Sequence, residues 1–211
     1  MTFIRTIPEQ EATGDVRDLY RRQRQGTGYL PNYATVYCHR PRLMQAWAGL
    51  QAEIKRAMDD KTYGLVSLAA ATAINSSYCS LAFATKLMRK YYTEAEMLAI
   101  VRGHGDSPLS AGERAIMLLA SKVATNAPAV TERDIRPLKE AGYTDPEIFD
   151  IVSAAAARCF FSKVPDALGV LPDAALGSLE QPLQELLTVG RPIAGGTRSN
   201  HDAAASNCPA S

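Results

Sequence analysis

Apolar residues recur at intervals of three or four positions along most of this chain of 211 residues. That interval is the one at which an α-helix places side chains on a single face. Met97, Ile100 and Val101 follow it, for example, and so do Ile148 and Val152. No stretch of the sequence combines the apolar–polar alternation of a strand with a hairpin turn. The pattern therefore predicts an all-α fold.

Four of the predicted helices have a recognisable start. Each opens with Ser or Thr followed three residues later by an acid, the pattern of a capping box, in which both side chains bond to backbone N–H groups. The four pairs are Thr93 with Glu96, Ser110 with Glu113, Thr131 with Asp134, and Thr144 with Glu147. Pro146 supports the last start, because a proline in the first turn removes an N–H group that has no partner there.

Helices are also predicted closer to the N-terminus. Residues 16–25 are polar and basic and indicate an exposed helix, whereas residues 41–58 have the pattern of an amphipathic helix. Residues 26–33, GTGYLPNY, separate the two as a turn region. Residues 61–74 are rich in alanine and mostly apolar, so we expect a buried helix there. Small alanine side chains let helices approach closely, within a bundle or across a subunit interface.

The chain divides into three predicted regions. We expect residues 1–60 to form a helical segment that packs on a helical core, and residues 61–180 to form that core. Residues 181–211 are predicted to be a C-terminal tail. From about residue 190, glycine, serine, asparagine and alanine dominate, and too few large apolar side chains remain to be buried. We therefore expect disorder from there on.

The charged residues nearly balance, with 23 basic and 22 acidic side chains. The chain therefore lacks the positive charge typical of a nucleic-acid-binding protein. No apolar run reaches the roughly 20 residues that a membrane span needs, and the N-terminal residues lack the apolar stretch of a secretory signal. These features predict a cytoplasmic protein that binds neither nucleic acid nor a membrane.

Cysteine and histidine are sparse and scattered. The cysteines are Cys38, Cys79, Cys159 and Cys208, and the histidines are His39, His104 and His201. Their spacing matches neither a zinc ribbon nor a metalloprotease motif, so we expect no metal site, no disulfide framework and no cofactor. His201 and Cys208 fall in the predicted tail and are weak candidates for a site.

Cys79 lies in the stretch AINSSYCSLAFA, where polar residues separate two apolar runs. Asn75 and Ser76 are of the types that end one helix and cap the next, which would place Cys79 in the first turn of a new helix. The unpaired N–H groups and the dipole of a helix start favour a thiolate. Ser76 and Phe83 would share the helix face of Cys79, with the Ser76 hydroxyl within reach of the sulfur. A small, buried and unreactive cysteine is the alternative.

The same stretch resembles the motif of the AhpD-like alkylhydroperoxidases, which belong with the carboxymuconolactone decarboxylase superfamily. In that motif CxYCxxxH opens a helix after an alanine-rich helix and a polar break, and here residues 76–83 read SSYCSLAF. Residues 28–47 are similar to a G-x-x-PN…HxP…L segment of the peroxidase-related members. Residues 109–152 look like the second half of those proteins, and residues 160–170 look like the end of that half. The resemblance covers roughly residues 8–173.

The resemblance implies an AhpD-like helical bundle that assembles as a homo-oligomer, commonly built around trimers. In the family, a glutamate on the preceding helix and the motif histidine activate the second motif cysteine, and the first cysteine then forms a disulfide with it. By position, Cys79 is the second cysteine and Tyr78 is the motif tyrosine. Ser76 stands in place of the first cysteine, Phe83 of the histidine and Gly64 of the glutamate. The two-thiol cycle and the proton relay of the family therefore cannot operate here.

Three functions are compatible with the sequence. We favour a peroxidase-related redox protein, in which Cys79, with Ser76 beside it, attacks a peroxide as its small-molecule substrate, becomes a sulfenic acid and is restored by an external thiol. The second is a non-redox, decarboxylase-like enzyme that binds a small hydrophobic substrate in a pocket enlarged by Gly64 and Phe83. The third is a non-catalytic binding or scaffold oligomer.

The second function would need an acid or a base from elsewhere in the chain. Tyr33, His39 and Tyr63 are candidates, although a histidine close to Pro41 is more typical of a structural turn.

Two further cysteines and the single tryptophan lie in apolar surroundings. Cys38 would restore a two-thiol mechanism only if it lay next to Cys79 in the folded chain. Cys159 and Trp47 are predicted to belong to the core.

Overall fold

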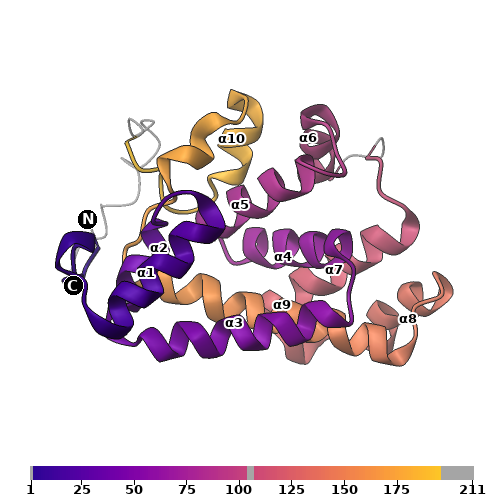
Figure 1. Cartoon of the computed structure of the whole chain (residues 1–211). Helices are drawn as coiled ribbons and strands as arrows, with labels where there is room; N and C mark the ends of the chain where they lie inside the picture. The colour runs from indigo at the N-terminus through magenta and orange to yellow at the C-terminus, as the bar shows by residue number, and fades with distance from the viewer. Residues whose placement is uncertain (1, 104–106, 196–211) are drawn as a thin grey trace, which may run out of the picture.

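The structure is a computed structural model that describes residues 2–103 and 107–195 (Figure 1). Within these residues the chain forms ten α-helices and no strand, which confirms the predicted all-α fold. The helices are α1 (Gly14–Thr27), α2 (Asn32–Val36), α3 (Pro41–Arg56), α4 (Asp60–Ala73), α5 (Ser77–Met88), α6 (Glu94–Arg102), α7 (Ala111–Asn126), α8 (Glu132–Glu140), α9 (Asp145–Ala167) and α10 (Gln181–Leu187). None of these helices is both long and apolar enough to cross a membrane.

The capping boxes predicted from the sequence mark four helix starts. α6, α7, α8 and α9 begin directly after Thr93, Ser110, Thr131 and Thr144. At the start of α9, the Glu147 carboxylate accepts hydrogen bonds from the N–H and hydroxyl groups of Thr144, both at 2.7 Å. Such bonds satisfy groups that a helix start leaves unpaired. Nearby residues alone therefore determine where these helices begin.

Helix α4 lies at the centre of the fold. It packs against α5, α7 and α9 and is buried from Tyr63 to Ala71. The alanines that it contributes are matched by Ala154 and Ala155 of α9, which are also buried. Because these side chains are small, three helices can approach α4 closely. The buried helix predicted over residues 61–74 is confirmed.

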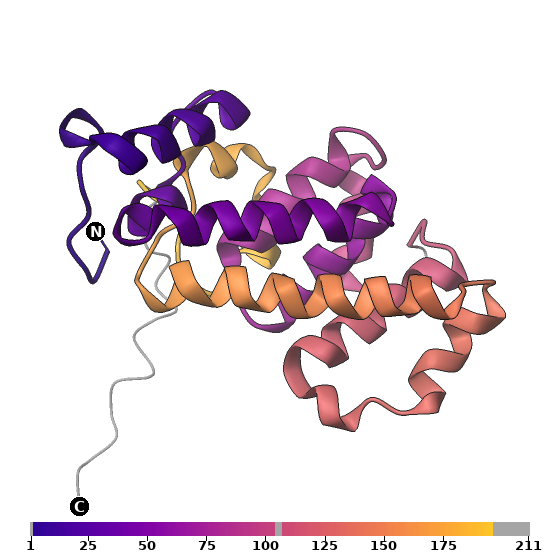
Figure 2. The same cartoon turned by 60° about the horizontal axis from the view of Figure 1, so that its bottom comes forward.

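The N-terminal helices cover one side of this core. α3 runs alongside α9 in both ribbon views and contacts it (Figures 1 and 2). Trp47 of α3 is buried and stacks on Phe161 of α9, with the ring centres 5.1 Å apart. α1 packs on α3 in turn. The aromatic contact joins the N-terminal segment to the core.

The C-terminal segment differs from the prediction. Residues 190–195, which we expected to begin a disordered tail, pack against the protein together with α10. Leu183 and Leu187 of α10 are buried, and so is Ile193. A few well-placed apolar side chains are enough to hold this segment, although its composition is mostly small and polar. The predicted tail from residue 196 onward, with His201 and Cys208, lies outside the described residues, as does His104.

A backbone contact ties this segment to the start of α5. The Gly190 N–H group donates a hydrogen bond to the Ser77 hydroxyl at 2.7 Å. A Cβ atom at residue 190 would lie 2.1 Å from the carbonyl oxygen of Asn75, so only glycine permits this approach.

Candidate functional site

The start of α5 is formed as predicted. Asn75 has a left-handed conformation, with φ at 58°, which ends the path of α4. Ser76 follows in an extended conformation as the N-cap residue, and α5 begins at Ser77. Cys79 is therefore the third residue of α5, in the turn whose N–H groups have no partners within the helix. The cysteine is buried, with 3% of its surface exposed.

A buried arginine lies beside the sulfur of Cys79. Arg158 of α9 is 2% exposed, and its Nη1 atom lies 3.9 Å from Cys79 Sγ, a long N–H···S contact. Among the described residues, no carboxylate forms an ion pair with Arg158. A buried cation without a counter-charge is costly. A thiolate at Cys79 would provide that charge.

Four aromatic side chains surround the Arg158 guanidinium. Its Cζ atom lies 4.4 Å from the ring centre of Phe83. The ring centres of Phe161, Trp47 and Tyr63 follow at 5.5, 5.6 and 6.0 Å. The faces of aromatic rings attract a cation and replace part of the hydration that it loses on burial. These rings carry no charge, so they hold the guanidinium without neutralising it.

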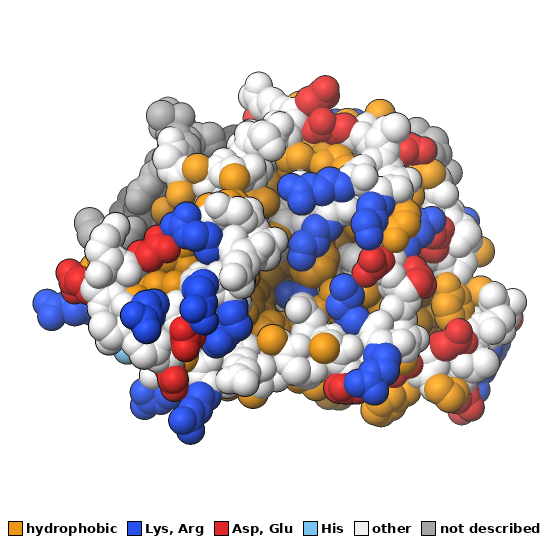
Figure 3. All heavy atoms as spheres, viewed as in Figure 1, with side chains coloured by type: hydrophobic (Ala, Val, Ile, Leu, Met, Phe, Trp, Pro, Cys, Tyr) orange, Lys and Arg blue, Asp and Glu red, His pale blue; other side chains and the backbone are white. Residues whose placement is uncertain are grey.

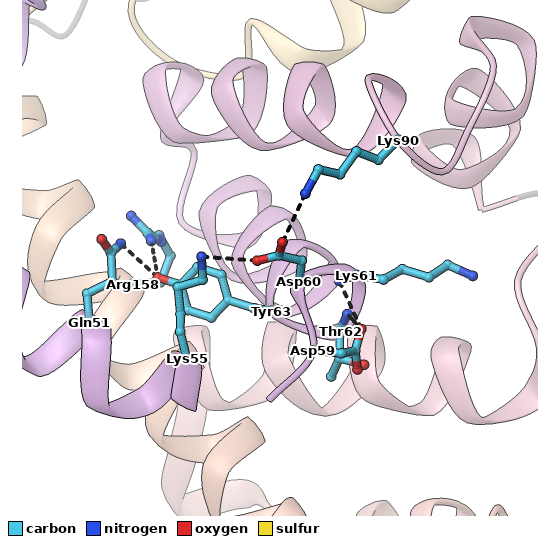
Figure 4. Close-up of polar contacts among 9 residues, drawn as sticks. All are labelled: Gln51, Lys55, Asp59, Asp60, Lys61, Thr62, Tyr63, Lys90 and Arg158. Carbon is cyan, nitrogen blue, oxygen red and sulfur yellow. Dashed lines mark hydrogen bonds and ion pairs between the residues drawn. The ribbon is translucent and has the colours of Figure 1, made fainter. Parts of the chain in front are cut away.

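Tyr63 is fixed at the site by two donors (Figure 4). Its hydroxyl oxygen accepts hydrogen bonds from Arg158 Nη2 at 2.8 Å and from Gln51 Nε2 at 2.9 Å. These two bonds occupy both lone pairs of the oxygen. Tyr63, an acid or base candidate in the sequence, is therefore placed to orient Arg158 and not to accept a proton.

The two remaining acid–base candidates have structural partners. The Tyr33 hydroxyl donates to Gln23 Oε1 at 2.6 Å, and burial raises the pKa of Tyr33. His39 is exposed, and its Nε2 atom lies 2.7 Å from the carbonyl oxygen of Arg5, as suits a turn. Neither residue is placed as a general base for Cys79.

Tyr37 is a neighbour of the site that sequence reasoning missed. Its ring stacks on Phe161 at 6.2 Å, and its buried hydroxyl has no hydrogen-bond partner within the described structure. Burial, together with the nearby Cys79, raises the pKa of Tyr37 to about 12. At neutral pH this phenol is therefore protonated and has a proton to donate.

The three positions that depart from the family motif have different surroundings. Ser76 is fully buried, and its hydroxyl forms no hydrogen bond to Cys79 and lies near the Asp166 carboxylate. Phe83 covers the Arg158 guanidinium. Gly64 faces Leu87, and a Cβ atom at residue 64 would lie 2.7 Å from Leu87 Cδ2. The space that a larger residue would use at position 64 is thus filled by leucine.

Replacing Gly64 by alanine should destabilise the protein by about 1–2 kcal/mol, because Leu87 is buried and cannot move away freely. Gly49→Ala is the matched control. Nothing lies within 4 Å of a Cβ atom there, so alanine should stabilise helix α3 by about 0.5–1 kcal/mol. Urea denaturation of both variants measures the difference, and equal midpoints would contradict the contact with Leu87.

Tyr78 anchors the start of α5. It does not line the cavity between α3, α4 and α5 that Gly64 and Phe83 border. The hydroxyl groups of Tyr78 and Tyr29 both donate to Oδ2 of Asp173, the second at 3.0 Å. The N–H group of Asn32 donates to Oδ1 of the same carboxylate at 2.7 Å. Burial and the adjacent carboxylate raise the pKa of Tyr78. This hydroxyl therefore acts as a donor to Asp173, and its role is structural.

Cys38, Cys79 and Cys159 are free thiols. Cys38 is buried, and its thiol lies beside the hydroxyl of Tyr20, whose pKa is raised by burial and also by this thiol. Cys159 is half-buried, and burial raises the pKa of its thiol. None of these three cysteines is part of a disulfide in the described structure. The described residues also hold no group of three or more His, Cys, Asp or Glu side chains that could bind a metal ion.

A cavity of about 280 Å³ lies between the end of α3, the start of α4 and the end of α5. Tyr63, Gly64, Phe83 and Leu87 contribute to its walls. Its charged lining residues are Lys55, Asp60, Lys86, Arg89 and Lys90. Figure 3 shows basic side chains gathered around a hollow with an apolar floor. The pocket is therefore bordered by more positive charge than the sequence led us to expect.

The cavity and the buried arginine share two walls. Phe83 and Tyr63 both line the cavity, and both contact Arg158, which in turn reaches Cys79. A layer of aromatic side chains thus separates the cavity from the guanidinium and the sulfur.

Arg158 is the principal residue that sequence reasoning missed, because the stretch AAAARCFF was interpreted as core. A signal was present. Arg158 falls on the same helical face as Ile151 and Ala155, and both of these are apolar residues that face the core. A charged residue at a core position of an apolar helix indicates a buried charge, and such charges are rarely buried without a partner.

Comparison with known proteins finds similarity in structure only. No protein-family model and no curated protein matches the sequence. The alkylhydroperoxidase AhpD core of an uncharacterized peroxidase-related protein from Ralstonia eutropha JMP134 superimposes with a TM-score of 0.73 at 18% identity, over 83% of this chain and 94% of that one. An uncharacterized peroxidase-related protein from Silicibacter sp. TM1040 gives 0.68 at 16% identity, over 83% and 91%.

A third similar structure belongs to a protein with a named activity. A variant of the debrominase Bmp8, in complex with 2,3,4-tribromopyrrole, superimposes with a TM-score of 0.70 at 18% identity, over 86% of this chain and 96% of that one. At such identities the similarity concerns the fold, and activity has to be argued from the site.

Proposed function

We propose that this chain, whose fold is that of the AhpD-like proteins, is a thiol-dependent redox enzyme in which Cys79 reacts with a peroxide. The proposal rests on one observation above all, the buried Arg158 guanidinium 3.9 Å from Cys79 Sγ without a carboxylate partner among the described residues. The first turn of α5 adds N–H groups that favour the same thiolate. Peroxides are the first substrates to test, because two structures of this fold are described as peroxidase-related.

The reaction has two halves. In the first, the Cys79 thiolate attacks the O–O bond of a hydroperoxide, so that an S–O bond forms, the O–O bond breaks, and an alkoxide leaves and takes up a proton. The protein then carries a sulfenic acid and the product is an alcohol. In the second half, one external thiol displaces water to form a mixed disulfide, and a second thiol releases Cys79. Two thiols are oxidised to a disulfide while one peroxide is reduced.

Arg158 would stabilise the Cys79 thiolate, but it cannot supply the proton relay of the family's glutamate and histidine. A guanidinium stays protonated at any working pH, so it stabilises an anion and transfers no proton. The proton for the leaving alkoxide comes from water or from a protonated hydroxyl group. Tyr37 is the buried phenol next to the site, and its pKa of about 12 keeps its proton in place at neutral pH.

Cys79 should become the site of a trapped sulfenic acid when the protein meets a hydroperoxide. A 1,3-dicarbonyl trap followed by peptide mass spectrometry measures it, and peroxide consumption with a small thiol reductant measures turnover. Cys79→Ser should reduce turnover to the buffer background. Cys159→Ser is the matched control and should keep the wild-type rate, because the proposed reaction does not involve the Cys159 thiol.

Equal turnover of wild type and Cys79→Ser would exclude the thiol as the catalyst. Turnover of a non-redox substrate would then favour the decarboxylase-like function. An absence of trapping at Cys79 together with an absence of turnover would favour a binding oligomer.

The homo-oligomer expected from the resemblance stays a prediction. Leu118 of α7 and Phe149 of α9 are large apolar side chains with 73% and 70% of their surfaces exposed. Exposed apolar side chains of this size are often covered by a partner subunit.

A further inference from the structure

The charges around the cavity do not balance. Asp60 is the single acid that lines it, and this carboxylate already accepts Lys55 Nζ at 3.1 Å and Lys90 Nζ at 3.0 Å (Figure 4). Lys86 and Arg89 line the same cavity, and neither forms an ion pair within residues 2–103 and 107–195. Two cations therefore border the cavity without a counter-charge.

A second observation places two positive charges next to one ring. Lys86 Nζ lies 4.9 Å from the ring centre of Phe83, and Arg158 Cζ lies 4.4 Å from the same centre. Two cations on one uncharged ring repel each other, and the ring offsets only part of that cost. The Lys86 residue as a whole is exposed, but its ammonium group is partly buried. This burial and the nearby charge of Arg158 both lower the pKa of Lys86.

We infer that this cavity binds a small organic carboxylate, with the carboxylate on Lys86 and Arg89 and the apolar part of the molecule against Phe83, Tyr63 and Leu87. A carboxylate would supply the negative charge that the lining lacks. A planar guanidinium also matches the two oxygens of a carboxylate.

The dimensions of the cavity limit the size of the ligand. A volume of about 280 Å³ lies at the lower end of the roughly 300–1,000 Å³ that is typical of small-molecule sites. This space suits a single ring or a short branched chain with one acidic group. The apolar walls disfavour a strongly hydrated inorganic anion, because such an ion would lose its water without gaining apolar contacts.

As a statement about the substrate, this inference rests on the proposed function, since it places a carboxylate-bearing peroxide next to the layer that covers Arg158 and Cys79. As a statement about binding, it can be measured without any chemistry at Cys79. Benzoate is the probe, benzyl alcohol is its uncharged counterpart, and inorganic phosphate is the free-anion control. Isothermal titration with the full chain measures all three.

Benzoate should bind the wild type at least tenfold more tightly than benzyl alcohol or phosphate. Lys86→Met and Arg89→Met should each weaken benzoate binding at least fivefold. Lys163→Met is the matched control, because Lys163 is exposed on α9 and does not line the cavity. Equal affinity for benzoate and benzyl alcohol, tighter binding of phosphate, or an equal loss in Lys163→Met would overturn the inference.

Two further measurements separate this inference from the proposed function. Cys79→Ser should bind benzoate as the wild type does, so a failure of the redox chemistry leaves the binding result intact. With an aromatic hydroperoxide supplied as the free carboxylate and as its methyl ester, the wild type should show a lower KM for the carboxylate. Lys86→Met should abolish that preference by raising KM for the carboxylate to the value for the ester. A preference that survives in Lys86→Met would contradict the assigned position of the carboxylate.

Discussion

Arg158→Met should slow the alkylation of Cys79 at pH 7 at least tenfold and reduce peroxide turnover by a similar factor. Two unit charges about 4 Å apart attract each other by about 4 kcal/mol at an effective dielectric constant of about 20. A third of that attraction is enough for a tenfold change in the rate. Alkylation with iodoacetamide, quenched at a series of times and followed by peptide mass spectrometry, measures the rate of alkylation at Cys79 itself.

The stability of this variant distinguishes a functional arginine from a structural one. Methionine fits a similar space and removes a buried charge that lacks an acidic partner in the described structure, so the free energy of unfolding should stay equal or increase. Arg158→Lys should give an intermediate alkylation rate, because a lysine keeps the charge but cannot reach Cys79 and Tyr63 together. If Arg158→Met loses stability while its alkylation rate stays at the wild-type value, the arginine serves the fold and not the sulfur.

Asp173→Ala should lower the free energy of unfolding by about 3 kcal/mol or more, which is the second large effect. The substitution leaves three donors without their acceptor, the hydroxyl groups of Tyr29 and Tyr78 and the N–H group of Asn32. A buried donor without a partner costs about 1–3 kcal/mol. In a domain of this size the thermal midpoint should fall by roughly 6–12 °C. Urea and thermal unfolding both measure the change.

Two companion variants test the cause. Asp173→Asn keeps an oxygen for the Asn32 N–H group, so its loss should be clearly smaller than that of Asp173→Ala. Asp15→Ala removes an exposed carboxylate that lies 3.6 Å from Arg42, and exposed pairs contribute little, so stability should change by less than about 0.5 kcal/mol. Equal losses in Asp173→Ala and Asp15→Ala would show that the buried hydrogen bonds are not the source of stability.

Local features of the sequence were enough to predict much of the fold. The helix starts at Thr93, Ser110 and Thr144 depend on bonds between residues three positions apart, so they can be recognised without tertiary structure. The break at Asn75 and Ser76, and with it the place of Cys79 in the first turn, depends on local conformation in the same way. These predictions are confirmed because their causes lie within a few residues.

The features that sequence reasoning missed depend on residues far apart in the chain. Arg158 and Cys79 are separated by 79 positions, and only the packing of α9 against α4 and α5 brings them together. The same holds for Tyr78, which meets Asp173 across 95 positions. The residues next to Arg158 and Tyr78 in the sequence do not indicate these contacts, so they could not be predicted from local patterns.

Residue 190 approaches Asn75 so closely that no molecule can pass between the C-terminal segment and the start of α5. Cys79 is 3% exposed and does not line the cavity. A reactant can therefore meet the sulfur only when neighbouring side chains, such as those of Phe83 or Tyr63, swing aside. The frequency of that local motion would then limit both the oxidation of the cysteine and its rescue by a thiol.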